Sequence, residues 1–140
     1  MLPHVDAFLG NKFTSAAARA LLTFPFWSSG LQKLSNWSAT VGEMEHFHLV
    51  PAPAYAIAVI VCQLGGSAAI LWGPFAWIGA WALIVFTALT IPIAHPFWTM
   101  SGQAGLLEMY TAMEHIGIIG GLLVAAVLRN RELPRSIAGG

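Results

Sequence analysis

The chain has 140 residues, of which 57% are hydrophobic and 9% are charged, and its mean hydropathy is +0.72. A soluble domain ordinarily carries about 25% charged residues, so this chain has too few charges to cover a surface that faces water. The composition therefore indicates an integral membrane protein in contact with the lipid bilayer. Six basic and six acidic residues give a formal net charge of zero, which excludes the basic surface typical of a nucleic-acid-binding domain.

Four apolar segments follow one another along the chain. The first contains Arg19 and Pro25, the second follows Pro51, and a short Gly-Pro-Phe turn at 73–75 separates the second from the third. A helix satisfies its own backbone hydrogen bonds in lipid, and about 20 apolar residues span the bilayer. The sequence thus predicts an all-α fold, one membrane domain over 1–140. We expect an antiparallel four-helix bundle with helices over about 16–34, 52–72, 76–95 and 110–128.

Lysine and arginine residues set the expected orientation. Lys33 alone lies on one side of the four segments, and five basic residues lie on the other, namely Lys12, Arg19, Arg129, Arg131 and Arg135. Basic residues collect on the cytoplasmic side of membrane proteins. We therefore expect a multi-pass protein of the bacterial inner membrane with both termini in the cytoplasm. The loops at about 35–51 and 96–109 would then face the periplasm.

Small residues mark one face of two predicted helices. Gly65 and Gly66 lie in the second segment, and Gly117 and Gly121 lie four residues apart in the fourth. Lipid supplies no hydrophobic drive between helices, so small residues stabilise their contacts by letting two backbones approach. We expect these faces inside the bundle, and the alternative is the seam of a homo-oligomer.

Each of the four predicted helices carries one short motif. "FWSSGLQKL" (26–34) closes the first segment, "QLGG" (63–66) lies in the second, "AHPFW" (94–98) closes the third, and "HIGIIGGLL" (115–123) runs into the fourth. In this order and spacing the chain resembles the DoxX family of small four-helix bacterial inner-membrane proteins.

The resemblance implies a membrane subunit of, or an accessory to, a quinone-linked oxidoreductase, with quinone as the possible cofactor. The chain has no flavin, nucleotide or iron–sulfur motif. It is therefore not expected to be self-sufficient as an enzyme, and a larger oxidoreductase or membrane complex would be its partner. Two alternatives remain open: a non-catalytic anchor or assembly subunit that packs against such a complex, and a small-solute transporter.

His95 ends the third segment between two prolines, Pro92 and Pro96. One interpretation is a histidine that donates to a backbone carbonyl freed by the prolines. The other is a pocket for a quinone headgroup on the periplasmic side, formed by His95, Trp98, Lys33 and Phe97. A quinone carbonyl gains a proton with each electron, which an imidazole can supply, and aromatic rings stack on a flat headgroup. Much of the second interpretation depends on the resemblance.

Lys33 is the one basic residue expected on the periplasmic side, and interfacial charges are usually paired or functional. We expect an ion pair with Glu43, Glu45 or Glu114. The segment "EMEHFH" (43–48) also raises the question of a metal site, because His46 and His48 are possible ligands. These two histidines are weak candidates, and an acidic surface loop is the simpler interpretation. Gln63 lies near mid-membrane and is expected to bond a neighbouring helix.

Overall fold

The computed structural model describes residues 2–132, and the side chains of residues 2–128. The described part contains no strand. Its elements are α1 (Pro3–Leu9), α2 (Lys12–Ser35), α3 (Trp37–His46), α4 (Ala52–Trp72), α5 (Ala76–Ala94), the short 3-10 helix η1 (Phe97–Thr99) and α6 (Gly102–Glu132). Arg135 lies outside the described residues, as do the side chains of Arg129 and Arg131.

Three of these helices are long and apolar enough to cross a membrane, by length and composition. They cover Ala52–Trp72, Ala76–Thr99 and Gly102–Leu128. Among the described residues, α2 does not join them, although it is 24 residues long, because Lys12, Arg19 and Lys33 and several hydroxyl residues lower its hydropathy. The described residues therefore form an all-helical fold with three candidate membrane spans.

Local sequence explains where α4 begins and ends. Pro51 precedes the first turn of α4 and Pro53 lies within it, where the missing N–H of proline costs no hydrogen bond. Gly73 follows the last residue with a φ of +100°, in the left-handed region that residues with a Cβ rarely adopt. The chain can therefore reverse at Gly73 and enter α5 three residues later.

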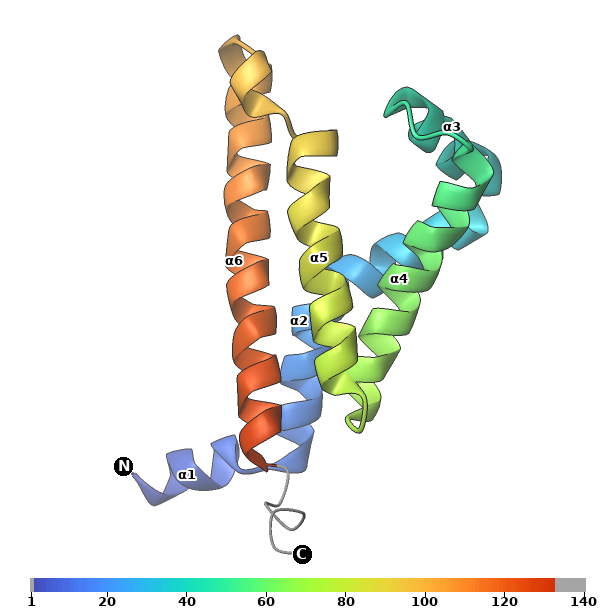
Figure 1. Ribbon diagram of the computed structural model, residues 1–140. Helices are drawn as coiled ribbons and strands as arrows, with labels where there is room; N and C mark the ends of the chain where they lie inside the picture. The colour runs from blue at the N-terminus through green and yellow to red at the C-terminus, as the bar shows by residue number, and fades with distance from the viewer. Residues whose placement is uncertain (1, 133–140) are drawn as a thin grey trace, which may run out of the picture.

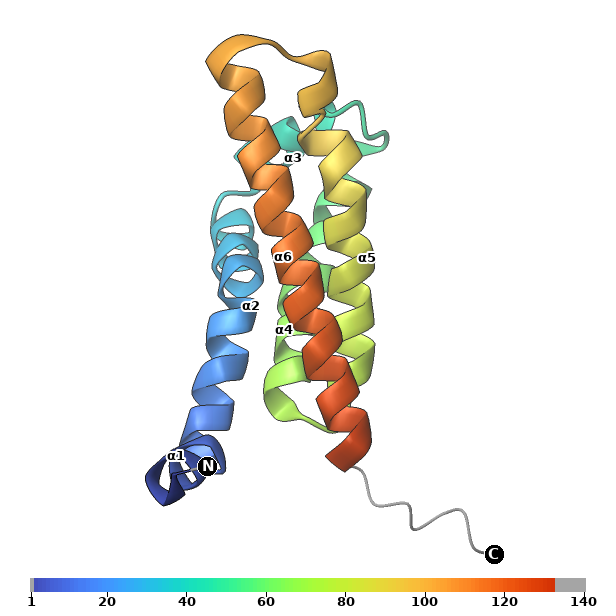
Figure 2. The same ribbon diagram turned by 90° about the vertical axis from the view of Figure 1, so that its left-hand side faces the viewer.

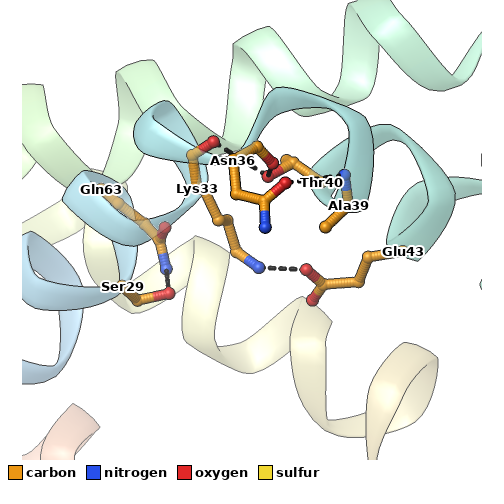
Figure 3. Close-up of polar contacts among 7 residues, drawn as sticks. All are labelled: Ser29, Lys33, Asn36, Ala39, Thr40, Glu43 and Gln63. Carbon is orange, nitrogen blue, oxygen red and sulfur yellow. Dashed lines mark hydrogen bonds and ion pairs between the residues drawn. The ribbon is translucent and has the colours of Figure 1, made fainter.

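A short turn at Asn36 places α3 across the end of α2. The Asn36 side chain accepts a hydrogen bond from the backbone N–H of Ala39, so the residue that ends α2 also caps α3. The Thr40 hydroxyl lies 3.0 Å from the carbonyl oxygen of Lys33 and 2.9 Å from that of Asn36 (Figure 3). Thr40 is buried, and its contacts hold α3 in a fixed position relative to the last turn of α2.

The helices are arranged around α4 and α5. Helix α5 packs between α4 and α6, while α2 packs on α4 and also contacts α6 (Figures 1 and 2). Towards the end that carries α3, α4 leans away from α5 (Figure 1). Helix α1 and the last turn of α6 lie at the opposite end, as both views show.

The tightest helix contact joins α4 to α5 at two glycines. A Cβ placed on Gly79 would lie 2.5 Å from the carbonyl oxygen of Gly66, which no side chain tolerates without movement. Leu83 packs over Gly66 and is fully buried. Next to this contact lies the main apolar cluster of the described residues, which consists of Phe26, Ile70, Ala80, Leu83, Ile84 and Leu122.

The prediction about small residues was right for two positions and wrong for two. Gly66 makes the α4–α5 contact, and a Cβ on Gly121 would meet Leu22 of α2 at 2.9 Å. Gly65 and Gly117, in contrast, have nothing within 4 Å of an added Cβ. Both glycines are exposed, on faces of α4 and α6 that meet no other described helix.

The predicted boundaries of α4 agree with the structure, and the predicted end of α5 differs by one residue. Three other regions differ more. Helix α2 begins at Lys12 rather than 16, because the Asn11 side chain caps it by accepting from the N–H of Phe13. The predicted loop at 35–51 contains α3. Helix α6 begins at Gly102 rather than 110, which removes most of the predicted loop at 96–109. The residues at the start of α2, in α3 and at the start of α6 are less apolar than the membrane spans, so a search for apolar runs does not find them.

Candidate functional site

A cavity of about 1110 Å³ lies between α4 and α5, lined by residues of α4 from Tyr55 to Gln63 and by residues of α5 from Trp77 to Ala94. Its wall is mainly apolar, as is usual for sites that take a small organic molecule. Several of the side chains that line it are themselves half exposed, among them Trp77, Trp81, Val85 and Leu89. The cavity therefore reaches the outer surface between the two helices.

Lys33 and Glu43 form an ion pair on the α2–α3 side of this cavity (Figure 3). Lys33 lies in the last turn of α2 and keeps only 15% of its side chain exposed, whereas the side chain of Glu43 is 40% exposed. The turn at Asn36 and the bonds of Thr40 set this pairing, because they fix α3 against α2. Of the three expected partners of Lys33, Glu43 makes the contact.

Gln63 lines the same cavity from the middle of α4. Its Nε2 donates to the hydroxyl of Ser29 on α2 over 3.3 Å, so it bonds a neighbouring helix as the sequence predicts. Its Oε1 is buried and has no hydrogen-bond partner among the described residues. A buried polar atom without a partner costs about 1–3 kcal/mol, so the unpaired Oε1 of Gln63 lowers the stability of the fold.

Two histidines and a glutamate form the opposite polar wall. His95 follows the last residue of α5, and its Nδ1 lies 2.6 Å from a carboxylate oxygen of Glu108 on α6. His115 lies two helical turns after Glu108 on α6. Its ring contacts the ring of His95 edge-on, with 4.8 Å between the centroids. Nδ1 of His115 lies 2.8 Å from the carbonyl oxygen of Thr111. His95, Glu108 and His115 all line the cavity.

The fold thus brings together residues that are far apart in sequence. Lys33 and His95, which the sequence places in one site, line the same cavity. Phe97 and Trp98 do not line it. Their rings pack against each other in η1, 5.2 Å apart, and Trp98 is 58% exposed. The turn after Pro96 directs this segment past the end of α5, away from the space between α4 and α5.

The remaining candidate residues lie elsewhere. Glu45 and Glu114 are exposed and make no ion pair with Lys33. His46 is the last residue of α3 and His48 follows it in the turn, and both are exposed. Within residues 2–128, no group of three or more histidine, cysteine, aspartate or glutamate side chains is placed to hold a metal ion.

Comparison with known proteins identifies the family. A family model described as DoxX matches residues 14–96, which is more than half of the chain. The chain belongs to the DoxX family. The match runs from the start of α2 to the end of α5, so this DoxX segment contains one cavity wall, with Lys33, Glu43 and Gln63, together with His95. No curated protein and no solved structure matches the chain.

Glu108 and His115 lie beyond the DoxX match, and sequence reasoning did not place either in the site. A usable signal was present, because residues seven apart lie on one face of a helix, and Glu108, Thr111 and His115 share such a face of α6. Which partner that face meets depends on how the end of α5 is positioned against α6. The sequence does not give that position.

Proposed function

We propose that this DoxX-family chain is a four-helix bundle in the bacterial inner membrane, with α2 as the fourth spanning helix and both ends cytoplasmic. The arrangement supports this because the first turns of α2, which carry Lys12 and Arg19, lie at the end shared with the last turn of α6. Exposed aromatic residues, which favour membrane interfaces, occur at both ends of the helices: Trp72 and Phe75 at one, and Trp98 and Tyr110 at the other.

Within that bundle, we propose that the cavity between α4 and α5 binds a membrane quinone. The observation that carries this proposal is one apolar cavity with polar groups on two walls, Lys33 on one and His95 on the other. An isoprenoid tail can enter from lipid between the half-exposed side chains of α4 and α5. A headgroup oxygen can then bond to either wall, and the apolar lining excludes water.

The chain would act as a membrane subunit of, or an accessory to, a quinone-linked oxidoreductase. Its own residues would bind and orient the quinone and exchange protons with it. Electrons would come from a partner protein, since the sequence carries no motif for a flavin, a nucleotide or an iron–sulfur cluster. A quinone, when bound, supplies the two-electron chemistry.

The experiment compares two tryptophan substitutions on α4. Ala58 lines the cavity, Ala68 does not, and both are exposed on the same helix. The purified chain in detergent is titrated with a short-chain ubiquinone analogue. We expect saturable binding that Ala58→Trp abolishes and Ala68→Trp retains. Trp98→Ala serves as a second control and should leave binding unchanged. Binding that is the same in both tryptophan variants, or no saturable binding at all, contradicts the proposal.

A second candidate is an anchor or assembly subunit that does no chemistry. The observation that favours it is the outer face of α6, where Gly117 and Gly120 have nothing within 4 Å of an added Cβ. Small residues on a lipid-facing surface allow another helix to approach closely, from a partner or from a second copy. Co-purification with a larger complex that Gly117→Leu disrupts, together with no quinone binding, would favour this function over the first.

A further inference from the structure

We propose that the histidine wall of the cavity recognises the reduced form of its ligand, a hydroquinone, through hydroxyl groups that donate to imidazole nitrogens. This inference rests on the proposed function and specifies the redox state that is bound more tightly. It assigns roles to Glu108 and His115, which lie outside the part of the chain that matches the family.

His115 has its tautomer set by the backbone. A carbonyl oxygen accepts hydrogen bonds and cannot donate, so Nδ1 of His115 must carry the hydrogen in its 2.8 Å contact with the Thr111 carbonyl. In the neutral ring the other nitrogen, Nε2, then has a lone pair and no hydrogen. Nε2 of His115 makes no hydrogen bond to any described residue, so it remains available to a ligand.

His95 is held in the same tautomer by a different partner. Nδ1 of His95 lies 2.6 Å from Glu108, whose side chain is 33% exposed to solvent. A carboxylate accepts hydrogen bonds, so Nδ1 of His95 donates, and in the neutral ring Nε2 is then the acceptor. Glu108 is therefore a positioning residue, because it orients the His95 ring and fixes which nitrogen faces the ligand, as a carboxylate does for histidine in other sites.

The two Nε2 acceptors discriminate between the forms of a quinone. A hydroquinone hydroxyl donates to Nε2, whereas a quinone carbonyl brings a second lone pair against it. Lys33 on the opposite wall gives no such discrimination, because an ammonium group donates to a carbonyl or to a hydroxyl oxygen alike. We assign the preference for the reduced form to His95 and His115 rather than to Gln63 Oε1, an acceptor that lies on the opposite wall.

The test measures the dissociation constants of one short-chain analogue in both redox forms at pH 8, without oxygen. We expect the hydroquinone to bind about tenfold more tightly, which corresponds to a rise of about 30 mV in the midpoint potential of the bound couple. His115→Phe should remove most of this preference and change the affinity for the quinone form less than twofold. Glu108→Gln should reduce the preference, and Glu114→Gln, on the exposed face of the same helix, should keep it.

The measurement on the unsubstituted protein decides the inference even if a variant does not fold. Equal affinity for both forms, or tighter binding of the quinone, overturns the inference and leaves the proposed quinone site standing. A preference that survives both His115→Phe and Glu108→Gln also overturns it, because the discrimination would then have another source. Absence of binding in either form removes the proposed function together with the inference.

Discussion

Replacing Gly79 by alanine tests the packing on which the cavity depends. The new Cβ would lie 2.5 Å from the backbone oxygen of Gly66, 2.9 Å from Cβ of Ala69 and 3.2 Å from Cγ1 of Ile70. The nearest of these atoms belongs to the backbone and cannot rotate away. Helices α4 and α5 must therefore separate by about 0.9 Å for that contact to rise from 2.5 Å to the 3.4 Å of ordinary van der Waals contact.

The cost follows from that separation. A gap of 0.5–1 Å forfeits roughly a quarter to a half of the dispersion energy of the atoms that face it. Overpacking of this kind costs about 1–3 kcal/mol, and we expect the upper half of that range because backbone is involved. For a chain of this size, each kcal/mol lowers the midpoint of thermal unfolding by about 4 °C. Gly79→Ala should therefore lower the midpoint by about 8–12 °C.

The assay is thermal unfolding of the purified protein in one detergent, followed by circular dichroism. Gly120→Ala is the matched control, since it makes the same change inside a helix and its added Cβ meets nothing within 4 Å, and it should be no less stable than the unsubstituted protein. If Gly79→Ala is as stable as Gly120→Ala, the close approach of α4 and α5 is refuted, and with it the position of the cavity between them.

Three further substitutions test the polar groups and the core. Glu43→Gln should destabilise the fold by about 1–3 kcal/mol in the same assay, because it leaves Lys33 largely buried without its partner. The control Glu45→Gln, at an exposed position, should cost less than about 0.5 kcal/mol. Equal effects of the two substitutions would contradict the ion pair. Gln63→Leu should change stability by less than about 1 kcal/mol, because the lost bond to Ser29 is offset by removal of the buried Oε1; a large loss would show that this amide is well satisfied. Leu83→Ala should cost about 2–5 kcal/mol, since Leu83 is fully buried, and a loss below 1 kcal/mol would contradict the core.

The sequence predicts the α4–α5 hairpin well because its signals are local. Pro51 and Gly73 delimit α4, and the apolar run between them is long enough to span a bilayer. Helix α3 and the first turns of α6 escaped prediction for a physical reason. They are shorter or less apolar, so their helical state depends on caps such as Asn36 and on packing, rather than on a hydropathy signal.

The candidate site was only half predictable. Lys33 and His95 line one cavity, as expected from the ends of the helices on which they lie. Their partners required the tertiary structure. Glu43 was one of three possible partners until α3 was placed, and Glu108 became a partner of His95 only through the arrangement of α5 against α6. Trp98 does not line the cavity, because the direction of the chain after Pro96 is not encoded in the apolar pattern.

The most direct test of the central claim maps where a quinone sits. A short-chain quinone with a photoreactive group is irradiated with the purified protein, and the labelled residues are located by mass spectrometry. The account predicts labels on residues that line the cavity from both sides, such as Val59 of α4 and Val85 and Leu89 of α5, and competition by unlabelled quinone. Labels confined to the outer face of α6, at Ile116 or Leu123, would contradict it.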